Sequence, residues 1–353
     1  MSRLTLIVPG WPSVLALYPA ESVPHDGLAW LLGRGRPCRD SAISCERLLA
    51  RFLGYAHLPE FLPLAALRRL GEDDGHNVGT GAHWLCADPV NVSFMGGNLL
   101  PDSFSWDEID AAEASALEAA LNENFASIGQ FSAVTPSRWY LRLAHPAKVR
   151  FFSLNEALFR PMQDFLPVRG DESVDAENEA RHWHQALNEI QVMLHNHPVN
   201  AARSAAGRRP INSLWFWGNG EQIRHGASGL RIGVQTNDSV ARGLARMAGI
   251  EPESPNVISA LRTDTVAVLD TFAAPAQHFD SLAYQTAWTA LEKDWFAPIA
   301  QRVKEGSLRH FSLHIPGEDA CFSLTLGAGA RWRFWRKPVS LEGVSDVILG
   351  RGD

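Results

Sequence analysis

The fold class is decided by a stretch near the start of the chain, Leu4-Thr5-Leu6-Ile7-Val8-Pro9-Gly10. Its first five residues form a nearly continuous apolar run, which is typical of a strand buried on both faces of a parallel sheet. Pro9 and Gly10 end the run, because this pair favours a turn. The stretch predicts an α/β protein with a loop at the carboxyl edge of the sheet, where such folds bind ligands.

Length and composition support a globular protein and exclude several other classes. The 353 residues suffice for one large or two ordinary domains, and the 46% of hydrophobic residues argues against disorder. The net charge of −7 and the lack of a long apolar stretch predict neither a nucleic-acid partner nor a membrane span. The four cysteines lack zinc or disulfide spacing, and no signal-peptide pattern is present, so we expect a cytoplasmic protein.

Helix and strand patterns continue along the rest of the chain. Apolar residues at helical spacing predict helices at residues 44–55, 64–70, 105–126, 179–194, 238–247 and 281–303. Short apolar runs predict strands at residues 138–143, 211–217, 265–269, 310–315, 321–326 and 331–335. The helix at 105–126 has the clearest start, because Ser105 and Glu108 have the spacing of a capping box.

Several residues invite a chemical interpretation but lack the rest of a motif. The histidine pairs are His182 with His184, His195 with His197, and His310 with His314. Each pair lacks a third ligand nearby in the sequence, so structural roles are predicted. Ser13 is outside a Gly-x-Ser-x-Gly motif, and the turn at residues 218–220 is too short for a phosphate-binding loop. We therefore predict no metal site and no cofactor.

Cations and aromatic residues alternate in one stretch, Arg331-Trp332-Arg333-Phe334-Trp335-Arg336-Lys337. In a strand, alternate side chains point to opposite faces, so the arginines and the rings would be separated. A packed edge strand is the favoured interpretation. A platform for single-stranded nucleic acid or phosphate is the alternative.

One region resembles a known family. The region comprises His195-Asn196-His197-Pro198-Val199-Asn200, Arg203, Gly207 and Pro210-Ile211-Asn212-Ser213-Leu214-Trp215-Phe216-Trp217-Gly218-Asn219-Gly220. It is similar to a segment of the archaeal-type, cofactor-independent phosphoglycerate mutases, which leads from an inserted cap domain back into the core. The helix at 240–249 and the strand before Pro9 also resemble elements of that family.

Over most of its length the chain resembles the RpfE-type bacterial regulatory proteins, relatives of those mutases. The shared elements are His83-Trp84, Ala87-Asp88-Pro89-Val90, Pro136-Ser137-Arg138-Trp139-Tyr140-Leu141, Leu187-Asn188-Glu189 and Arg333-Phe334-Trp335-Arg336-Lys337-Pro338. The resemblance implies an alkaline-phosphatase-like core, a mixed sheet with helices on both faces. This core would comprise residues 1–82 and 211–353, interrupted by an inserted α+β cap domain at 83–210.

The chain departs from the mutase pattern where the reaction needs its ligands. The mutases have an Asp-Gly metal ligand after the first strand, and this chain has Pro9-Gly10. Their Asp-Glu-Ala-Gly-His motif compares with residues 314–319, which lack the final histidine. Their substrate-binding Arg-Cys-Asn triplet is replaced around residues 87–89. Because two-metal phosphoryl transfer depends on such carboxylates, their loss should abolish the chemistry.

Three functions are consistent with this pattern. The preferred prediction is a catalytically degenerate relative of phosphoglycerate mutase with a regulatory or ligand-sensing role. The first alternative is an active mutase or phosphatase with rearranged ligands, taken from Asp73, Asp74, His76, Asp264 and Asp319. The second alternative is a protein-interaction module with a Trp-rich surface. Metal content and mutase turnover separate the first two.

If a ligand binds, we expect a phosphorylated small molecule, with a protein as the other candidate partner. The predicted ligand-binding residues are His197, Asn200, Arg203, Asn212, Trp217 and Asn219. They are expected in a cleft between core and cap, because domain seams form concave sites. Of the 12 tryptophans, Trp84, Trp139, Trp183, Trp215 and Trp217 lie in or beside the cap and its return to the core, and tryptophans are expected to line that seam.

Overall fold

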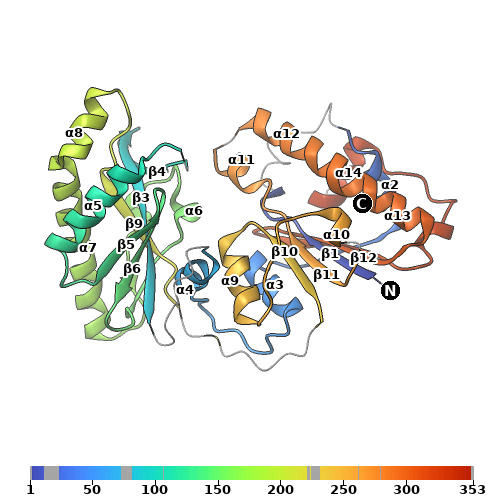
Figure 1. Ribbon diagram of the computed structural model, residues 1–353, viewed down its shortest axis with the longest axis horizontal. Coiled ribbons are helices and arrows are strands. Elements are labelled where there is room, and N and C mark those ends of the chain that lie inside the picture. Colours follow the sequence, from blue (N-terminus) through green and yellow to red (C-terminus); the bar gives the residue numbers. More distant parts are fainter. Residues whose placement is uncertain are drawn as a thin grey trace. The chain divides into compact units, whose positions relative to one another are not determined.

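The computed structural model describes residues 2–11, 24–72, 82–105, 107–220, 223, 231–260, 262–278 and 280–350. The chain forms two compact units, and Figure 1 labels most of their helices and strands. Unit 1 consists of Met1–His57 and His225–Asp353, and unit 2 consists of Leu58–Arg224. The core and cap boundaries expected after residues 82 and 210 both lie within unit 2.

Unit 1 is built on a six-stranded mixed sheet with the strand order β10-β11-β1-β12-β13-β2. The strands are β1 (Ser2–Ile7), β2 (Arg36–Ser41), β10 (Gly233–Thr236), β11 (Thr265–Val268), β12 (Leu308–Pro316) and β13 (Ala320–Leu326). The first four in spatial order are parallel, and β13 and β2 are antiparallel to their neighbours. The predicted buried strand at residues 4–8 is confirmed, since Leu4 and Leu6 of β1 are fully buried.

The helices of unit 1 are α2 (Asp26–Arg34), α3 (Cys45–Phe52), α9 (Ser239–Met247), α10 (Val257–Ala260), α11 (Ala273–His278), α12 (Ser281–Leu291), α13 (Ala297–Glu305) and α14 (Leu341–Leu349). The predicted helix at 281–303 contains a π-helical turn, η2 (Glu292–Phe296), between α12 and α13. Buried Glu292 accepts hydrogen bonds from the Gly27 and Leu28 N–H groups at 2.6 and 3.2 Å. The carboxylate thereby satisfies free donors in the first turn of α2.

Unit 2 contains a five-stranded sheet with the order β4-β3-β6-β5, in which β9 also pairs with β3. Its strands are β3 (His83–Met95), β4 (Asn98–Ser103), β5 (Gln130–Thr135), β6 (Arg138–Leu143) and β9 (Ser213–Trp217). All of these pairings are antiparallel. A small ribbon joins β7 (Val149–Arg150) to β8 (Val168–Arg169). The strand predicted at 211–217 therefore belongs to the sheet of unit 2.

The helices of unit 2 are α4 (Leu64–Gly71), α5 (Ala111–Asn124), α6 (Leu154–Ala157), the 3-10 turn η1 (Met162–Phe165), α7 (Val174–Asn196) and α8 (Pro198–Ala205). The helix predicted at 179–194 lies within the longer α7, and Pro198 begins α8. This position suits proline because the first helical N–H has no partner within the helix. None of the helices in the described ranges is long and apolar enough to span a membrane.

The predicted start of the helix at 105–126 is wrong. The α5 helix begins after Asp110, whose side chain and Glu113 form the capping box. Ser105 instead lies in a turn, where its N–H donates to Glu108 Oε2 at 2.6 Å. The Ser-x-x-Glu spacing was present, but the apolar face begins later, at Ile109.

The predicted strand at 331–335 is also wrong. Ala330–Trp332 form a 3-10 turn, η3, and irregular backbone follows it. Both edges of the preceding strand, β13, are already paired, with β12 and β2. The segment is instead attached to the residues before β2, where Arg333 donates to the Arg34 carbonyl oxygen at 2.8 Å. Alternation of side chains was therefore not enough to make a strand.

Several tryptophans lie inside the core of one unit. In unit 1, Trp11 packs against Trp288 with ring centroids 5.1 Å apart. In unit 2, Trp183 packs against Phe216 at 5.2 Å, and Trp139 belongs to the same core. The prediction that tryptophans line a domain seam is wrong for Trp139 and Trp183, because side chains of their own unit enclose them.

Candidate functional site

The carboxyl ends of the parallel strands in unit 1 present polar groups at one edge of the sheet. Asp238 follows β10 and begins α9, where its Oδ1 accepts a hydrogen bond from the Ala241 N–H at 2.7 Å. Asp270 follows β11, two residues after the strand ends. His314 lies near the end of β12, with its ring centroid 5.2 Å from that of Phe52. In α/β sheets this edge is the usual ligand-binding edge.

Burial shifts these groups toward their neutral forms. Burial raises the pKa of the Asp270 carboxyl above its ordinary value. Burial also lowers the pKa of His314, and the charge of Asp40 only partly opposes this effect. The pKa of Cys45 is raised well above its usual value by burial and by nearby carboxylates, including Asp270. Titratable groups whose pKa is shifted by burial at a ligand-binding edge are candidates for proton exchange or for hydrogen bonds to a ligand.

The residues after β1 do not fit the metal site that the mutase resemblance implies. Pro9 offers no ligand atom, and Gly10 has a φ of 78°, which suits glycine. A side chain at Gly10 would also meet Phe272, because its Cβ would lie 3.2 Å from that carbonyl oxygen. Within the described ranges, no group of three or more His, Cys, Asp or Glu residues could hold a metal ion.

Some predicted candidates lie outside these ranges or apart from the edge. Ser13, Asp73, Asp74 and His76 fall outside the residues that the structure describes. Asp264 lies directly before β11 and accepts a hydrogen bond from the Arg3 N–H at 2.8 Å. It therefore lies at the amino end of these strands, opposite to the carboxyl edge. Of the histidine pairs, His184 binds the Pro167 carbonyl oxygen at 2.7 Å.

A buried ionic cluster occupies unit 2 where the mutase resemblance places a substrate-binding triplet. Arg68 of α4 forms two hydrogen bonds to Asp88 of β3, at 2.8 and 2.7 Å. Arg68 Nε donates to the Tyr140 hydroxyl at 3.0 Å, which in turn donates to Glu72 Oε1 at 2.6 Å. Trp217 Nε1 donates to Asp88 Oδ2 at 2.8 Å. The five side chains form a continuous chain of donors and acceptors.

The electrostatics of this cluster favour the paired state. Burial opposes the charge of Arg68, but the adjacent Asp88, together with Cys86 and Tyr140, more than offsets burial and holds the pKa of Arg68 above its usual value. Burial raises the pKa of Tyr140 despite the nearby Arg68, so its hydroxyl stays protonated. Both terminal nitrogens of Arg68 donate to the Asp88 carboxylate. Arg68 therefore has a structural role.

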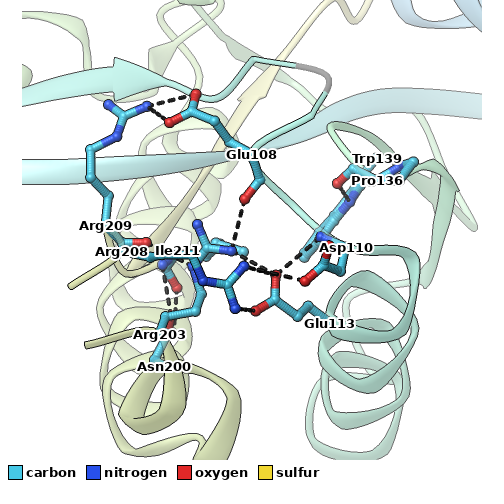
Figure 2. A network of polar contacts seen from close by, with 10 residues as sticks. All are labelled: Glu108, Asp110, Glu113, Pro136, Trp139, Asn200, Arg203, Arg208, Arg209 and Ile211. Carbon is cyan, nitrogen blue, oxygen red and sulfur yellow. Dashed lines mark hydrogen bonds and ion pairs between the residues drawn. The ribbon is translucent and has the colours of Figure 1, made fainter. Parts of the chain in front are cut away.

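A second network, drawn in Figure 2, holds the predicted site residue Arg203. Arg203 is 1% exposed, and its Nη1 lies 2.6 Å from Glu113 Oε2. Its Nε donates to the Arg209 carbonyl oxygen at 2.7 Å. Glu113 also pairs with Arg208 at 2.5 Å, and Arg209 pairs with Glu108 at 2.7 Å. A phosphate at Arg203 would therefore have to displace Glu113.

The other predicted site residues also make contacts within unit 2. Asn200 Nδ2 donates to the carbonyl oxygens of Leu194 and Ile211, each at 2.7 Å. Asn212 exchanges two hydrogen bonds with the backbone of Val92, at 2.7 and 2.8 Å. His197 Nδ1 accepts from the Val199 N–H, and Asn219 Nδ2 donates to the Val149 carbonyl oxygen. The six predicted residues do not converge on one site. Asn200 and Arg203 lie in the network of Figure 2, whereas Trp217 belongs to the Arg68 cluster.

Sequence reasoning missed the residues with the strongest structural signals. Asp270 directly follows a strand that the apolar pattern predicts, and a carboxylate at that position was a usable signal. Arg68 and Asp88 are 20 residues apart in sequence, on a helix and a strand, and no spacing rule joins them. Such a pair can be identified only in the folded structure, where α4 lies against β3.

Comparisons of sequence place the chain near one group of enzymes. No protein-family model matches the sequence. Over 188 residues, 52% of this chain, it is 27% identical to the 2,3-bisphosphoglycerate-independent phosphoglycerate mutase 2 of Methanothermobacter thermautotrophicus. Over 71 residues, 19% of this chain, it is 34% identical to a probable mutase of the same kind from Geobacter sulfurreducens. The chain spans 42% and 18% of the lengths of these relatives.

Solved structures share the fold. The PH0037 protein of Pyrococcus horikoshii aligns with all of this chain and 98% of its own, with a TM-score of 0.58 and 11% identity. The predicted fold class is confirmed: the protein has mixed sheets with helices in an alkaline-phosphatase-like fold. By its sequence, the chain is related to the cofactor-independent phosphoglycerate mutases.

Proposed function

We propose that this chain is a cytoplasmic, phosphoglycerate-mutase-like protein that has lost phosphoryl transfer and acts by binding. Its role would be regulatory or ligand-sensing, as in the RpfE-type bacterial proteins that it resembles. The observation that carries the proposal is Pro9-Gly10 after β1, where the mutase pattern needs an aspartate ligand. Two-metal phosphoryl transfer needs such carboxylates to hold the ions that stabilise the attacking and leaving oxygens.

The arginines of unit 2 give independent support. A phosphate-binding guanidinium needs donors that are free to meet the ligand. Arg68 and Arg203 are both buried and paired with carboxylates, Asp88 and Glu113. Each pair would have to break, leaving a buried carboxylate without its cation, before the arginine bound phosphate.

Metal analysis combined with a turnover assay tests the loss of catalysis. We expect purified protein to contain no stoichiometric manganese or zinc by mass spectrometry, and to show no conversion of 3-phosphoglycerate in the presence of either ion. About two metal ions per chain together with mutase turnover would overturn the proposal. That result would favour the active alternative, in which Asp73, Asp74 and His76 supply rearranged ligands.

A thermal-shift screen tests the ligand-sensing role. The probes are 3-phosphoglycerate, inorganic phosphate and other phosphorylated metabolites, added to the full chain. Because a ligand that binds only the folded state raises the unfolding temperature, a sensor should show a dose-dependent rise. Asn219→Ala tests the predicted site, because Asn219 is half-buried and its side chain donates to the Val149 carbonyl oxygen at 2.9 Å. Stoichiometric capture of one protein without any metabolite shift would instead favour the interaction module.

A further inference from the structure

A group of exposed aromatic side chains lies in unit 1, apart from the strand edge that carries Asp270. Trp332, Phe334 and Trp335 are 63%, 78% and 68% exposed. The rings of Phe334 and Trp335 pack edge to face, with centroids 5.4 Å apart. Large exposed rings that cluster in this way are typical of interaction surfaces. The cationic-aromatic face comprises residues 331–337 together with residues 34–41, which include strand β2.

Hydrogen bonds attach the aromatic segment to the residues directly before β2. Arg333 Nη1 donates to the Arg34 carbonyl oxygen at 2.8 Å, and Arg336 Nη1 donates to the Gly35 carbonyl oxygen at 3.1 Å. Strand β2 begins at the next residue, Arg36. The exposed rings and the edge strand are therefore neighbours on one surface.

This face is rich in cations. They are Arg34, Arg36, Arg39, Arg331, Arg333, Arg336 and Lys337. Within the described ranges, no carboxylate forms an ion pair with any of them. The net charge of the whole chain is −7, so this concentration of positive charge is local. Such a surface is complementary to an anionic partner.

Arg34 gives a separate indication of an anion. Its Nε and Nη1 atoms are buried and have no hydrogen-bond partner in the described structure, while its guanidinium lies 5.6 Å from the centre of the Trp30 ring. A buried donor without an acceptor is unfavourable, and each such atom calls for a missing group. A carboxylate is a strong acceptor for a guanidinium N–H group.

Strand β2 indicates that the partner is a polypeptide. It is the last strand of the six-stranded sheet, all six of its residues are exposed, and no described strand pairs with its outer edge. An open edge presents N–H and C=O groups that an extended peptide can pair with. A nucleic acid offers no such ladder, and a long polyanion would be repelled by the negative remainder of the chain.

We propose that the cationic-aromatic face binds an acidic, extended segment of another protein. The segment adds to β2 as a strand, its carboxylates pair with the arginines around Arg34, and its apolar side chains contact Trp332 and Trp335. This proposal does not depend on whether phosphoryl transfer has been lost, because it uses none of the residues at the carboxyl edge of the sheet.

Fluorescence anisotropy with a labelled twelve-residue peptide of alternating Glu and Val tests the proposal on the full chain. We expect binding that weakens with salt. A Gln-for-Glu peptide, and a peptide N-methylated at alternate amides, should each bind at least about tenfold more weakly, a difference that single groups at an interface can produce. The double variant Trp332→Ala/Trp335→Ala should lose a similar factor. Phe94→Ala, which removes a ring that is 75% exposed in unit 2, is the matched control.

Other outcomes overturn the proposal. Equal binding of the Glu and Gln peptides, no peptide binding at millimolar concentration, or equal loss in Phe94→Ala would each contradict it. Preferential binding of a twenty-nucleotide oligothymidine would identify a nucleic-acid surface instead. Binding to vesicles with 30% phosphatidylserine, without peptide binding, would identify a lipid surface. Self-association that the same Trp variant abolishes, measured by ultracentrifugation, would identify a second copy of this chain as the occupant.

Discussion

The buried ion pairs of unit 2 contrast with Asp270, a half-buried carboxyl group of unit 1. In unit 2, Arg68 and Arg203 are enclosed together with the carboxylates Asp88 and Glu113. In unit 1, Asp270 is held by burial in an environment that disfavours its charge, and no ion pair in the described structure involves it. Buried charges in complete pairs are typical of structural roles, whereas desolvated groups without a counter-charge are typical of functional sites.

The comparison makes the edge of unit 1 the better candidate for residual chemistry or ligand contact. The predicted residues of the mutase-like segment, by contrast, make hydrogen bonds within unit 2 that hold its backbone in place. That segment connects α7, α8 and β9 of unit 2, and its asparagines bridge backbone groups in the connections. Sequence similarity there reflects the folding of unit 2 as much as any ligand.

The largest effect is expected from breaking the Arg68 and Asp88 pair. Arg68→Met leaves the Asp88 carboxylate buried without its cation, which should cost about 3–5 kcal/mol of unfolding free energy. Urea denaturation followed by tryptophan fluorescence measures the loss. Arg181→Gln, which removes an exposed ion pair on α7, is the control and should change stability little.

A double variant sharpens this result. Arg68→Met/Asp88→Leu removes both charges and should recover a large part of the lost stability, because no unpaired carboxylate is left behind. A loss for Arg68→Met no larger than that for Arg181→Gln would show that the pair is not structural. The distinction between the two units would then fail.

The second prediction concerns Asp270, and the effect has the opposite sign. Because the folded state raises the pKa of Asp270, folding is penalised once the pH exceeds the ordinary carboxyl value of about 3.9. Asp270→Asn should therefore raise Tm at pH 7, by roughly 2–4 °C for a gain near 1 kcal/mol. The gain should disappear below pH 4, where the wild-type carboxyl is protonated in both states.

Differential scanning fluorimetry across pH 3.5 to 8 measures this effect. Asp238→Asn is the matched control at the same edge, since asparagine caps a helix about as well as aspartate does. A fall in Tm for Asp270→Asn at pH 7 would mean that the carboxylate has a stabilising partner. Asp270 would then resemble the paired charges of unit 2.

More of the fold than of the candidate site could be predicted from the sequence, because helices and strands depend on local patterns whereas the site depends on non-local contacts. The strand at residues 4–8 and the helix at 238–247 depend on local apolar patterns and caps, and both are observed. The strand predicted at 331–335 is not formed because a strand also needs a pairing partner elsewhere in the chain, and alternation of side chains does not report whether the segment finds one. The ion pair of Arg68 with Asp88 is similarly non-local, since α4 and β3 meet only in the folded unit.

The smallest expected effect is the pH dependence that His314 contributes. Burial lowers its pKa in the folded state, so below about pH 6.5 the unfolded state binds the proton more readily and stability falls. His314→Gln should flatten the decline of Tm between pH 7 and pH 5 by about 1–2 °C. His310→Gln changes an exposed histidine on the same strand and should leave the slope unchanged. If both variants flatten it equally, His314 is not a desolvated group, and the contrast between the two units rests on Asp270.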